Sequence, residues 1–344
     1  MRSRGPSAVP VKTLNEAFST RSTRRRYEAW FLRLGLADGS GAWWFRYLLM
    51  SPARASCPGN PKGMPVQVWA TWFPAQGKPQ SFIQGFPLQG LQLSAKASTP
   101  FHFQIADNVI DDASCQGSLH VDGHTVSWDL HYSSTFRTTL SSKGWIGFSR
   151  TPHSDATFCG EITLDGRSFA GSPLGFGVQG HNCGYRHRKF WTWTHAYFPR
   201  PGASASTLEA LVYEMPLGLV FRKAVLWHEG IQHVFRNLRD KQDADEAFAW
   251  CFHCSADDGL ELEAAIDGSG PGIHVLPYLK TDCSGTFDVT NNSFAKAHVR
   301  LQERGGAVAI LETDSNAVLE KTGGATRTRE LSPGDLPRSR TLTR

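Results

Sequence analysis

The sequence predicts an all-β protein made of two packed antiparallel barrel or sandwich units with few short helices. Apolar stretches are separated by two-residue turn signals at Asp122-Gly123, Asp165-Gly166, Glu229-Gly230, Asp267-Gly268 and, as a further candidate, Gly305-Gly306. Asp-Gly pairs tolerate the positive φ that a tight hairpin requires. The flanking stretches alternate in polarity at every second residue, as half-buried strands do. Helical periodicity is nearly absent, and the best helix candidates are short, at 14–18 and 243–247.

The turn signals fall into two sets, which predicts two β domains. Two signals precede residue 180 and three follow it, and the glycine-rich stretch Gly171–Gly184 lies between the sets. We therefore predict a first domain over 27–184 and a second over 185–324. Residues 1–26 are expected to be a basic disordered tail and residues 325–344 a flexible tail.

The amino-acid composition and the distribution of charge along the chain indicate the class of protein and its partners. The chain has 344 residues and a formal charge of +5, with 40% hydrophobic and 19% charged residues, which is typical of a folded domain. The excess of basic residues lies in the two tails, and the body between them is acidic. A nucleic-acid-binding body should itself be basic, so no nucleic-acid partner is expected. The basic N-terminal tail could assist peripheral contact with a membrane.

The N-terminus and the cysteines point to a cytoplasmic protein. The first residues contain no apolar segment of the kind that signal peptides carry. Seven cysteines, an odd and irregularly spaced set, are typical of reduced thiols. Oligomeric state is not predicted.

Neither a metal nor an organic cofactor is expected. The only Cys-x-x-Cys pair, Cys251 and Cys254, lies in a predicted strand over 248–254, where the two thiols would point to opposite faces. The phosphate-binding loop, the dinucleotide fingerprint and the Gly-x-Ser-x-Gly nucleophile motif are all missing from the sequence. An enzyme built on this chain would therefore use acid–base chemistry.

The chain is rich in aromatic residues, and one predicted strand gathers several of them. There are 11 Trp, 21 Phe and 7 Tyr. As a strand, residues 191–198 place Trp191, Trp193, His195 and Tyr197 on one face. That face could line a pocket for a hydrophobic ligand, or it could be ordinary core packing around a hydrogen-bonded histidine.

The densest polar cluster is Gly180–His187. It contains His181, Asn182, Cys183, Arg186 and His187. Histidine moves protons near neutral pH, and arginine can polarise a substrate oxygen or lower the pKa of a neighbouring histidine. The cluster is a candidate catalytic segment. The alternative is a structural loop whose polar groups bond to one another.

Four segments in this order resemble a known family. They are Tyr27-Glu28-Ala29-Trp30-Phe31-Leu32-Arg33, Ser51-Pro52, Trp128-Asp129-Leu130-x-Tyr132 and Gly180-His181-Asn182-Cys183-Gly184-x-Arg186-His187. Together they resemble the two-domain lipocalin-like proteins that include carotenoid 1,2-hydratase, with tocopherol cyclase and fungal Diels–Alderases as more distant relatives. The resemblance covers about residues 27–315.

The resemblance implies two packed lipocalin-like β domains with an apolar pocket in or between them. It implies chemistry on an isoprenoid or polyene without a redox cofactor, through protonation of a carbon–carbon double bond followed by water addition or ring closure. By matching position, it assigns the polar loop to His181, Asn182, Arg186 and His187. It also assigns aromatic and acid–base positions to the next two strands; these are Trp191, Trp193, His195, Tyr213 and Glu214.

The leading hypothesis is thus a cofactor-independent hydratase or cyclase. Its expected catalytic residues are His187, Glu214, His181 and Asp129. Its expected substrate-binding residues are Asn182, Arg186, Trp191, Trp193, His195 and Tyr213. One alternative is a carrier of a hydrophobic small molecule, and another is a structural protein without a ligand. Convergence of a carboxylate and a histidine in one pocket would favour the enzyme over the carrier.

Overall fold

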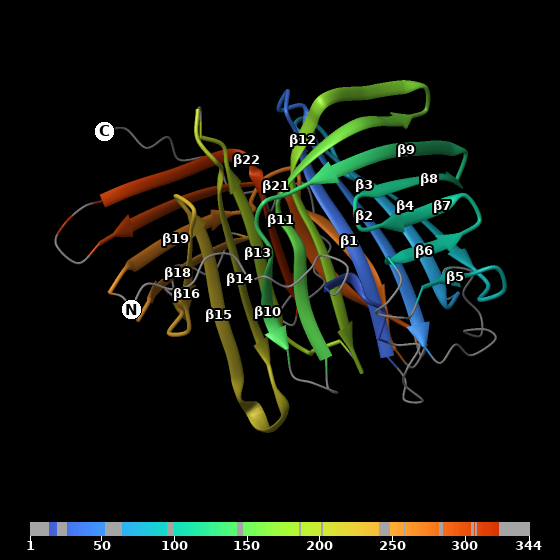
Figure 1. The fold of residues 1–344 in the computed structure, drawn as a ribbon. Coiled ribbons are helices and arrows are strands. Elements are labelled where there is room, and N and C mark those ends of the chain that lie inside the picture. Colours follow the sequence, from blue (N-terminus) through green and yellow to red (C-terminus); the bar gives the residue numbers. More distant parts are fainter. Residues whose placement is uncertain are drawn as a thin grey trace, which may run out of the picture.

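The all-β prediction is confirmed by the computed structural model (Figure 1). It describes residues 14–18, 26–51, 64–94, 100–142, 147–185, 187–200, 202–240, 248–257, 259–281, 285–303, 306 and 308–322. Regular structure in these residues is almost entirely strand, apart from helical residues Leu14 and Asn15 and a 3-10 turn at Pro216–Gly218. In this part of the chain there is no helix that could cross a membrane.

The described strands form two antiparallel sheets, of 12 and 10 strands. The first contains β1 (Arg26–Leu36), β2 (Gly41–Ser51), β3 (Val66–Pro74), β4 (Gln80–Phe86), β5 (Gln92–Leu93), β6 (His102–Ile105), β7 (Asn108–Asp111), β8 (Ser114–Val121), β9 (His124–Ser133), β10 (Thr138–Ser142), β11 (Gly147–Leu164) and β12 (Arg167–Gly184). The second contains β13 (Trp191–Phe198), β14 (Ser206–Glu214), β15 (Val220–His228), β16 (Ile231–Phe235), β17 (Arg239–Asp240), β18 (Ala249–Ser255), β19 (Glu261–Asp267), β20 (His274–Leu279), β21 (Thr286–Gln302) and β22 (Val308–Thr322).

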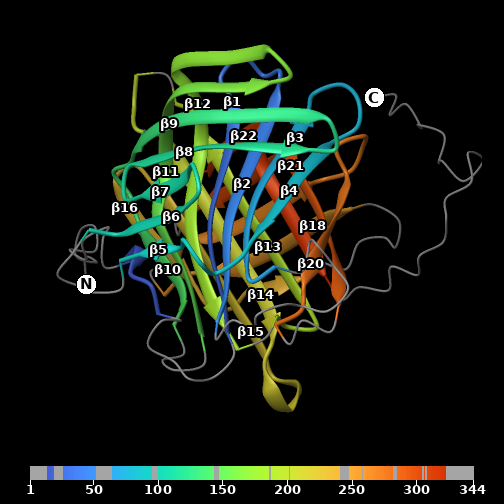
Figure 2. The same ribbon diagram turned by 90° about the vertical axis from the view of Figure 1, so that its right-hand side faces the viewer.

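The two sheets repeat one topology. In each, a meander (β1–β4, β13–β16) joins a long hairpin (β11–β12, β21–β22) because the last hairpin strand pairs with the first meander strand. In each, the strand preceding the hairpin (β10, β20) branches off and pairs only with the first hairpin strand. The first sheet also curls, so that β4 comes close to β8 (Figure 2).

Each sheet fills its concave side with its own apolar core. In the first, Trp30, Trp43, Phe45 and Tyr47 are fully buried and pack with other apolar side chains from β1 to β12. In the second, residues such as Phe198, Phe235 and Phe252 do the same.

A third core lies between the sheets. Because neighbouring strand residues point to opposite faces, Trp44 faces away from the core that holds Trp43 and Phe45. It packs with Phe31 and Trp69 of the first sheet, and with Trp193 and Trp227 of the second. Ring contacts such as Phe31–Trp193, at 5.5 Å between centroids, cross the junction. This shared layer holds the two sheets together.

A buried arginine adds a polar anchor to this junction. Arg33 of β1 donates from Nε and Nη2 to the Ser293 carbonyl at 3.0 and 2.6 Å, and from Nη2 to the carbonyls of Ser315 and Ala317 at 2.8 and 3.1 Å. Its side chain is inaccessible to solvent, and burial lowers its pKa to about 9. The charge is thus neutralised by carbonyl dipoles rather than by a carboxylate.

The turn predictions are confirmed at three places. Asp122-Gly123, Asp165-Gly166 and Glu229-Gly230 each connect paired strands with positive φ at both residues. Asp267-Gly268 is not such a turn, because β19 ends there and a longer connection leads to β20. The Gly305-Gly306 candidate and the predicted helix at 243–247 fall wholly or partly outside the described residues.

Residues 14–18 are packed, contrary to the expectation of a disordered tail over 1–26. The Asn15 side chain exchanges hydrogen bonds with Gln179 at 3.3 and 3.0 Å, and Trp30 Nε1 donates to the Asn15 carbonyl at 3.1 Å. Ala17 joins the core of the first sheet. This short segment closes one end of that sheet.

The glycine-rich stretch Gly171–Gly184, which separates the two sets of turn signals, is strand of the first sheet. It forms most of β12 and pairs with both β1 and β11. Glycine is required there for a close approach of backbones: a Cβ at Gly177 would lie 1.9 Å from the Arg33 carbonyl oxygen. The connection between the sheets begins only after Gly184.

Candidate functional site

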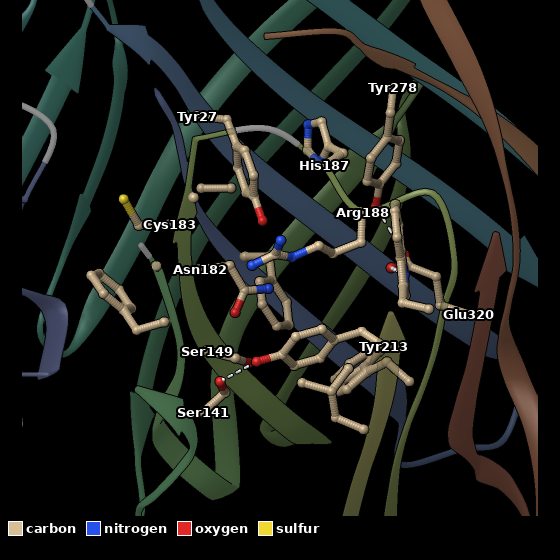
Figure 3. A pocket seen from close by; sticks show the side chains of 18 of the residues that line it. Tyr27, Ser141, Ser149, Asn182, Cys183, His187, Arg188, Tyr213, Tyr278 and Glu320 are labelled. Atoms are coloured by element: carbon tan, nitrogen blue, oxygen red, sulfur yellow. Dashed lines mark hydrogen bonds between the residues drawn. The ribbon is translucent and has the colours of Figure 1, made fainter. Parts of the chain in front are cut away.

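A pocket of about 950 Å³, counting the space at its mouth, opens between the two sheets (Figure 3). Its walls come from β1, β2, β10, β11 and β12 of the first sheet and from β13, β14, β20 and β22 of the second. Aromatic side chains dominate the walls; they are Tyr27, Phe31, Trp44, Phe148, Trp191, Trp193, Tyr213 and Tyr278. Polar side chains lie among them; they are Arg46, Ser141, Ser149, Asn182, His187, Arg188 and Glu320.

Glu320 is the carboxyl group of this pocket. Alternation along β22 turns its side chain toward the pocket, whereas Leu319 belongs to the core of the second sheet. Its two oxygens accept hydrogen bonds from Trp191 Nε1 at 2.8 Å and from the Tyr278 hydroxyl at 2.9 Å. Burial raises its pKa, and these bonds, with the nearby charge of Arg46, only partly oppose the rise. The group is a carboxylic acid that retains its proton more readily than an exposed glutamate.

Arg46 provides the positive charge beside Glu320. Its guanidinium carbon lies 3.9 Å from the centroid of the Tyr278 ring and 5.0 Å from that of Trp69, so the group is held by aromatic faces. Only 5% of the residue is exposed, and Nη1 has no hydrogen-bond partner in the described structure. Arg46 favours the ionised form of Glu320 and therefore strengthens it as an acid.

His187 lies in the same pocket and is neutral. Its ring stacks on Tyr27 with centroids 3.9 Å apart, and it lies 5.8 Å from the ring of Tyr278. Burial, followed by the charge of Arg46, lowers its pKa well below the usual value, while a hydrogen bond with the Leu279 backbone opposes this. Its Nε2 has no partner among the described residues. A neutral imidazole with an unused nitrogen can accept a proton.

Glu320 and His187 meet around one side chain. Tyr278 donates to Glu320 through its hydroxyl and contacts His187 through its ring. Figure 3 shows the three side chains on one side of the pocket. The structure therefore brings a carboxyl group and a histidine into one pocket, the convergence that distinguishes the enzyme hypothesis from a carrier.

A second group of polar side chains lines the opposite side of the pocket. Arg188, whose guanidinium carbon lies 5.4 Å from the Tyr213 ring centroid, reaches into the pocket, and Asn182 lines it as well (Figure 3). The Tyr213 hydroxyl shares a 2.8 Å hydrogen bond with Ser141 Oγ. Several donors thus surround the space between Tyr27 and Tyr213.

His181 lies outside the pocket, in a sealed pair. Its Nε2 is 2.8 Å from Glu28 Oε1, and its Nδ1 donates to the Leu14 carbonyl at 2.7 Å. Phe18 N donates to the same Glu28 oxygen at 2.7 Å. Both side chains are inaccessible to solvent. This geometry indicates a structural pair beneath residues 14–18, and neither residue lines the pocket.

The other predicted catalytic acids are also elsewhere. Asp129 is on the solvent face of β9, with 70% of its side chain exposed and His131 4.0 Å away. Glu214 ends β14 and does not line the pocket, because the preceding residue, Tyr213, is the one that points inward. Strand alternation separates Glu214 from the site, and the fold separates Asp129.

Most of the predicted substrate-binding residues do line the pocket. Asn182, Trp191, Trp193 and Tyr213 are all there. His195 shares the face of Trp191 and Trp193 but lies beyond the pocket, buried, 2.7 Å from the Ser154 carbonyl. Burial lowers its pKa to about 3, so it is neutral. Arg186 lies outside the described residues.

Sequence reasoning missed Glu320, Arg46, Tyr278 and Arg188. Two of them carried a usable signal. Arg46 is the single charge in the apolar run Gly41–Met50, and Glu320 is the single acid in Ala317–Glu320. A lone charge in a buried strand is expensive unless it is paired or functional. Tyr278 carried no such signal.

A second buried acid lies behind the wall of the pocket. Glu209 accepts hydrogen bonds from Thr151 Oγ1 at 2.9 and 2.7 Å and from Trp193 Nε1 at 3.1 Å. Burial raises its pKa to about 7 against these bonds. Because the Trp193 side chain lines the pocket and Glu209 does not, Glu209 supports the wall.

No site for a metal ion is evident in the described part of the chain. No group of three or more His, Cys, Asp or Glu side chains there is arranged to hold one. Cys251 and Cys254 alternate between faces of β18, the first half-buried and the second buried.

Comparisons with known proteins give a fold likeness. The sequence matches no protein-family model and no curated protein sequence. Kievitone hydratase from Nectria haematococca has a similar structure, with a TM-score of 0.54 and 10% identity over 94% of this chain and 97% of that one. A putative AttH from Nitrosomonas europaea gives 0.48 and 13% identity over 94% and 98%. At this identity the first likeness supports a fold related to that of a lipocalin-like hydratase.

Proposed function

We propose that this protein is a cofactor-independent hydratase or cyclase that protonates a carbon–carbon double bond of a hydrophobic, isoprenoid- or polyene-like substrate. The observation that carries the proposal is that Glu320 and His187 both line the aromatic pocket between the sheets. A buried acid with a raised pKa and a neutral histidine are the two proton-transfer groups that hydration needs. The fold likeness to kievitone hydratase is consistent with this chemistry.

Glu320 supplies the proton in the first step. The π electrons of the double bond take the proton from the Glu320 carboxyl, a C–H bond forms, and the O–H bond breaks. The other alkene carbon becomes a cation, which the ring faces of Trp191, Trp193 and Tyr278 stabilise. The resulting carboxylate is stabilised by Trp191, Tyr278 and Arg46.

His187 completes the reaction. A water oxygen bonds to the cationic carbon, and Nε2 of His187 accepts the proton that the water releases. Return of that proton to Glu320 restores the starting state, so the net change is addition of H and OH. In a cyclase, an alkene or hydroxyl of the substrate replaces the water.

The test combines isotope labelling with two matched variants. Farnesol, lycopene and a geranyl-substituted phenol are incubated with the protein in H₂¹⁸O, and products are analysed by mass spectrometry. We expect a labelled hydration product, or an isomer of changed retention if a ring closes. Glu320→Gln should bind substrate and lose turnover by about 10³-fold, because amides do not supply the proton. Glu161→Gln, which alters an exposed acid bonded to Ser168 outside the pocket, should retain turnover.

The outcomes separate the hypotheses. Wild-type turnover in a folded Glu320→Gln variant would overturn the assignment of the acid. Stoichiometric binding of one probe, without turnover by the wild-type protein, would instead favour the carrier alternative.

A further inference from the structure

The pocket holds two guanidinium groups without an anionic partner. Arg46 and Arg188 both line it, and neither forms an ion pair or hydrogen bond with a residue in the described part of the chain. Glu320 does not neutralise them by direct contact, because its oxygens are occupied by Trp191, Tyr278 and Asn291. Its carboxyl also tends to stay protonated. The described pocket therefore carries excess positive charge.

Arg188 is the better placed of the two to meet a ligand. Arg46 lies flat against Tyr278 and Trp69, with 5% of the residue exposed. Arg188 is only partly buried, and its guanidinium extends into the space between Tyr27 and Tyr213 (Figure 3). The Asn182 amide and the Ser141–Tyr213 hydroxyl pair border the same space.

Placing an uncompensated guanidinium in an aromatic pocket costs free energy, which an oxyanion would recover. Arginine presents donors in a planar fork that matches two oxygens of one acidic group. Among the described lining residues there are two arginines and no lysine. The positive charge of two arginines matches a ligand group with a single negative charge better than it matches a diphosphate.

Resting on the proposed function, we infer that the substrate carries an acidic oxygen group, a carboxylate or a phenolate, attached to its apolar body. Arg188 binds this group between Tyr27 and Tyr213, and Arg46 adds long-range attraction. The apolar body then extends along the aromatic walls, which presents its double bond to Glu320 and His187. Contact of the acidic group with Arg188 and of the double bond with Glu320 fixes the orientation of the substrate in the pocket.

The test measures binding to matched charged and neutral probes. Farnesoic acid and methyl farnesoate share one chain and differ in charge at pH 7.5. A geranyl-substituted nitrophenol and its methyl ether form the second pair, which distinguishes phenolate from carboxylate. Binding is followed by quenching of tryptophan fluorescence, because Trp44, Trp191 and Trp193 line the pocket.

We expect wild-type protein to bind the charged member of at least one pair about 30-fold more tightly than the neutral member. In Arg188→Met the preference should fall to about threefold or less, and Arg188→Lys should retain part of it. The matched control is Arg167→Met, which removes an arginine that lies over Phe169 at a hairpin outside the pocket, and it should behave as wild type.

Equal binding of charged and neutral probes by wild-type protein would overturn the inference. So would a preference that survives in Arg188→Met, or binding of farnesol without binding of either anion. Because the readout is affinity, loss of the hydratase proposal leaves this test intact. Turnover of neutral probes with no preference for anions would overturn only this inference.

Discussion

Glu320 and Arg46 act on each other through charge rather than through a hydrogen bond. Burial favours the protonated acid, and Arg46 favours the carboxylate that proton transfer leaves behind. In the proposed reaction, this opposition provides an acid that keeps its proton more readily than an exposed glutamate and whose carboxylate is stabilised after proton transfer. Burial, followed by the same charge, lowers the pKa of His187 and holds it neutral.

The rate should therefore depend on pH in a definite direction. Turnover needs protonated Glu320, so kcat should fall as pH rises through its raised pKa. Replacing Arg46 with Met removes the charge that lowers this pKa, so the fall should move to higher pH. The measurement is a kcat profile of both proteins with the best substrate from the labelling experiment. A fall at the same pH in both proteins would contradict the assignment.

Glu209 predicts a pH effect on stability instead. Its pKa is about 7 in the folded protein, against 4.5 for the free group, so between these values the folded state holds a proton that the unfolded state has released. The stabilisation of the folded state by protonated Glu209 is complete below about pH 4.5. It decreases by about 3 kcal/mol as the pH rises toward 7.

The Glu209→Gln variant carries no titrating group at this position. Its unfolding free energy, relative to wild type, should rise by about 3 kcal/mol between pH 4.5 and 7.5 in urea titrations. The difference between two proteins cancels other titrations, such as that of His195. Glu161→Gln, an exposed acid bonded to Ser168, is the control. A constant difference across this range would show that Glu209 does not titrate as described.

At the scale of elements, two glycines of β12 leave space for different neighbours, one a backbone carbonyl and the other a side chain. A Cβ on Gly177 would meet the Arg33 carbonyl at 1.9 Å, whereas a Cβ on Gly180 would meet the Phe31 ring at 2.2 Å. The first obstacle is the backbone of a paired strand, which cannot rotate away. The second is a side chain that lines the pocket.

The two alanine substitutions should therefore separate stability from binding. Gly177→Ala should lower the unfolding free energy by about 3 kcal/mol, because β1 and β12 must move apart. Gly180→Ala should cost about 1 kcal/mol and displace Phe31 toward Trp193, which weakens ligand binding. Urea titrations and fluorescence quenching measure the two effects. Similar stability losses with unchanged binding would contradict this distinction.

Local sequence chemistry accounts for the elements that could be predicted. Asp-Gly and Glu-Gly turns identified three hairpins, and alternation identified β13 and β18. Asp267-Gly268 was misread because a turn signal says nothing about which strand follows. The glycine-rich stretch 171–184 carried no local strand signal, and its glycines serve the close packing of β12 against β1.

At the scale of the whole molecule, the site residues that could not be predicted are those placed by strand pairing over long sequence distances. Trp191, Trp193, Tyr213, Asn182 and His187 were found because they lie close together in sequence. Glu320 and Arg46 come from strands far apart in the chain, which meet only after both sheets form and pack. The β13–β22 register places Glu320 opposite Trp193, and the pairing of β2 with β1 and β3 places Arg46. No local pattern encodes either register.

Arg33 gives a test of that packing. It reaches from β1 to carbonyls of β21 and β22, and its hydrogen bonds all cross the junction. Arg33→Met should lower the unfolding free energy by about 3 kcal/mol, because buried carbonyls lose their donors. Arg33→Lys should lose less, and Arg167→Met on the surface should lose about 0.5 kcal/mol or less. Wild-type stability of Arg33→Met in urea titrations would refute the anchoring role.

The separate cores within each sheet have a consequence for how such a protein can diversify. The residues that hold each sheet together lie on one face of its strands, and those that meet a ligand lie on the other. Substitutions along the shared seam can therefore alter ligand preference while each half keeps its own interior. Such changes leave the two interiors intact, and their cost in stability is confined to the layer that joins the sheets.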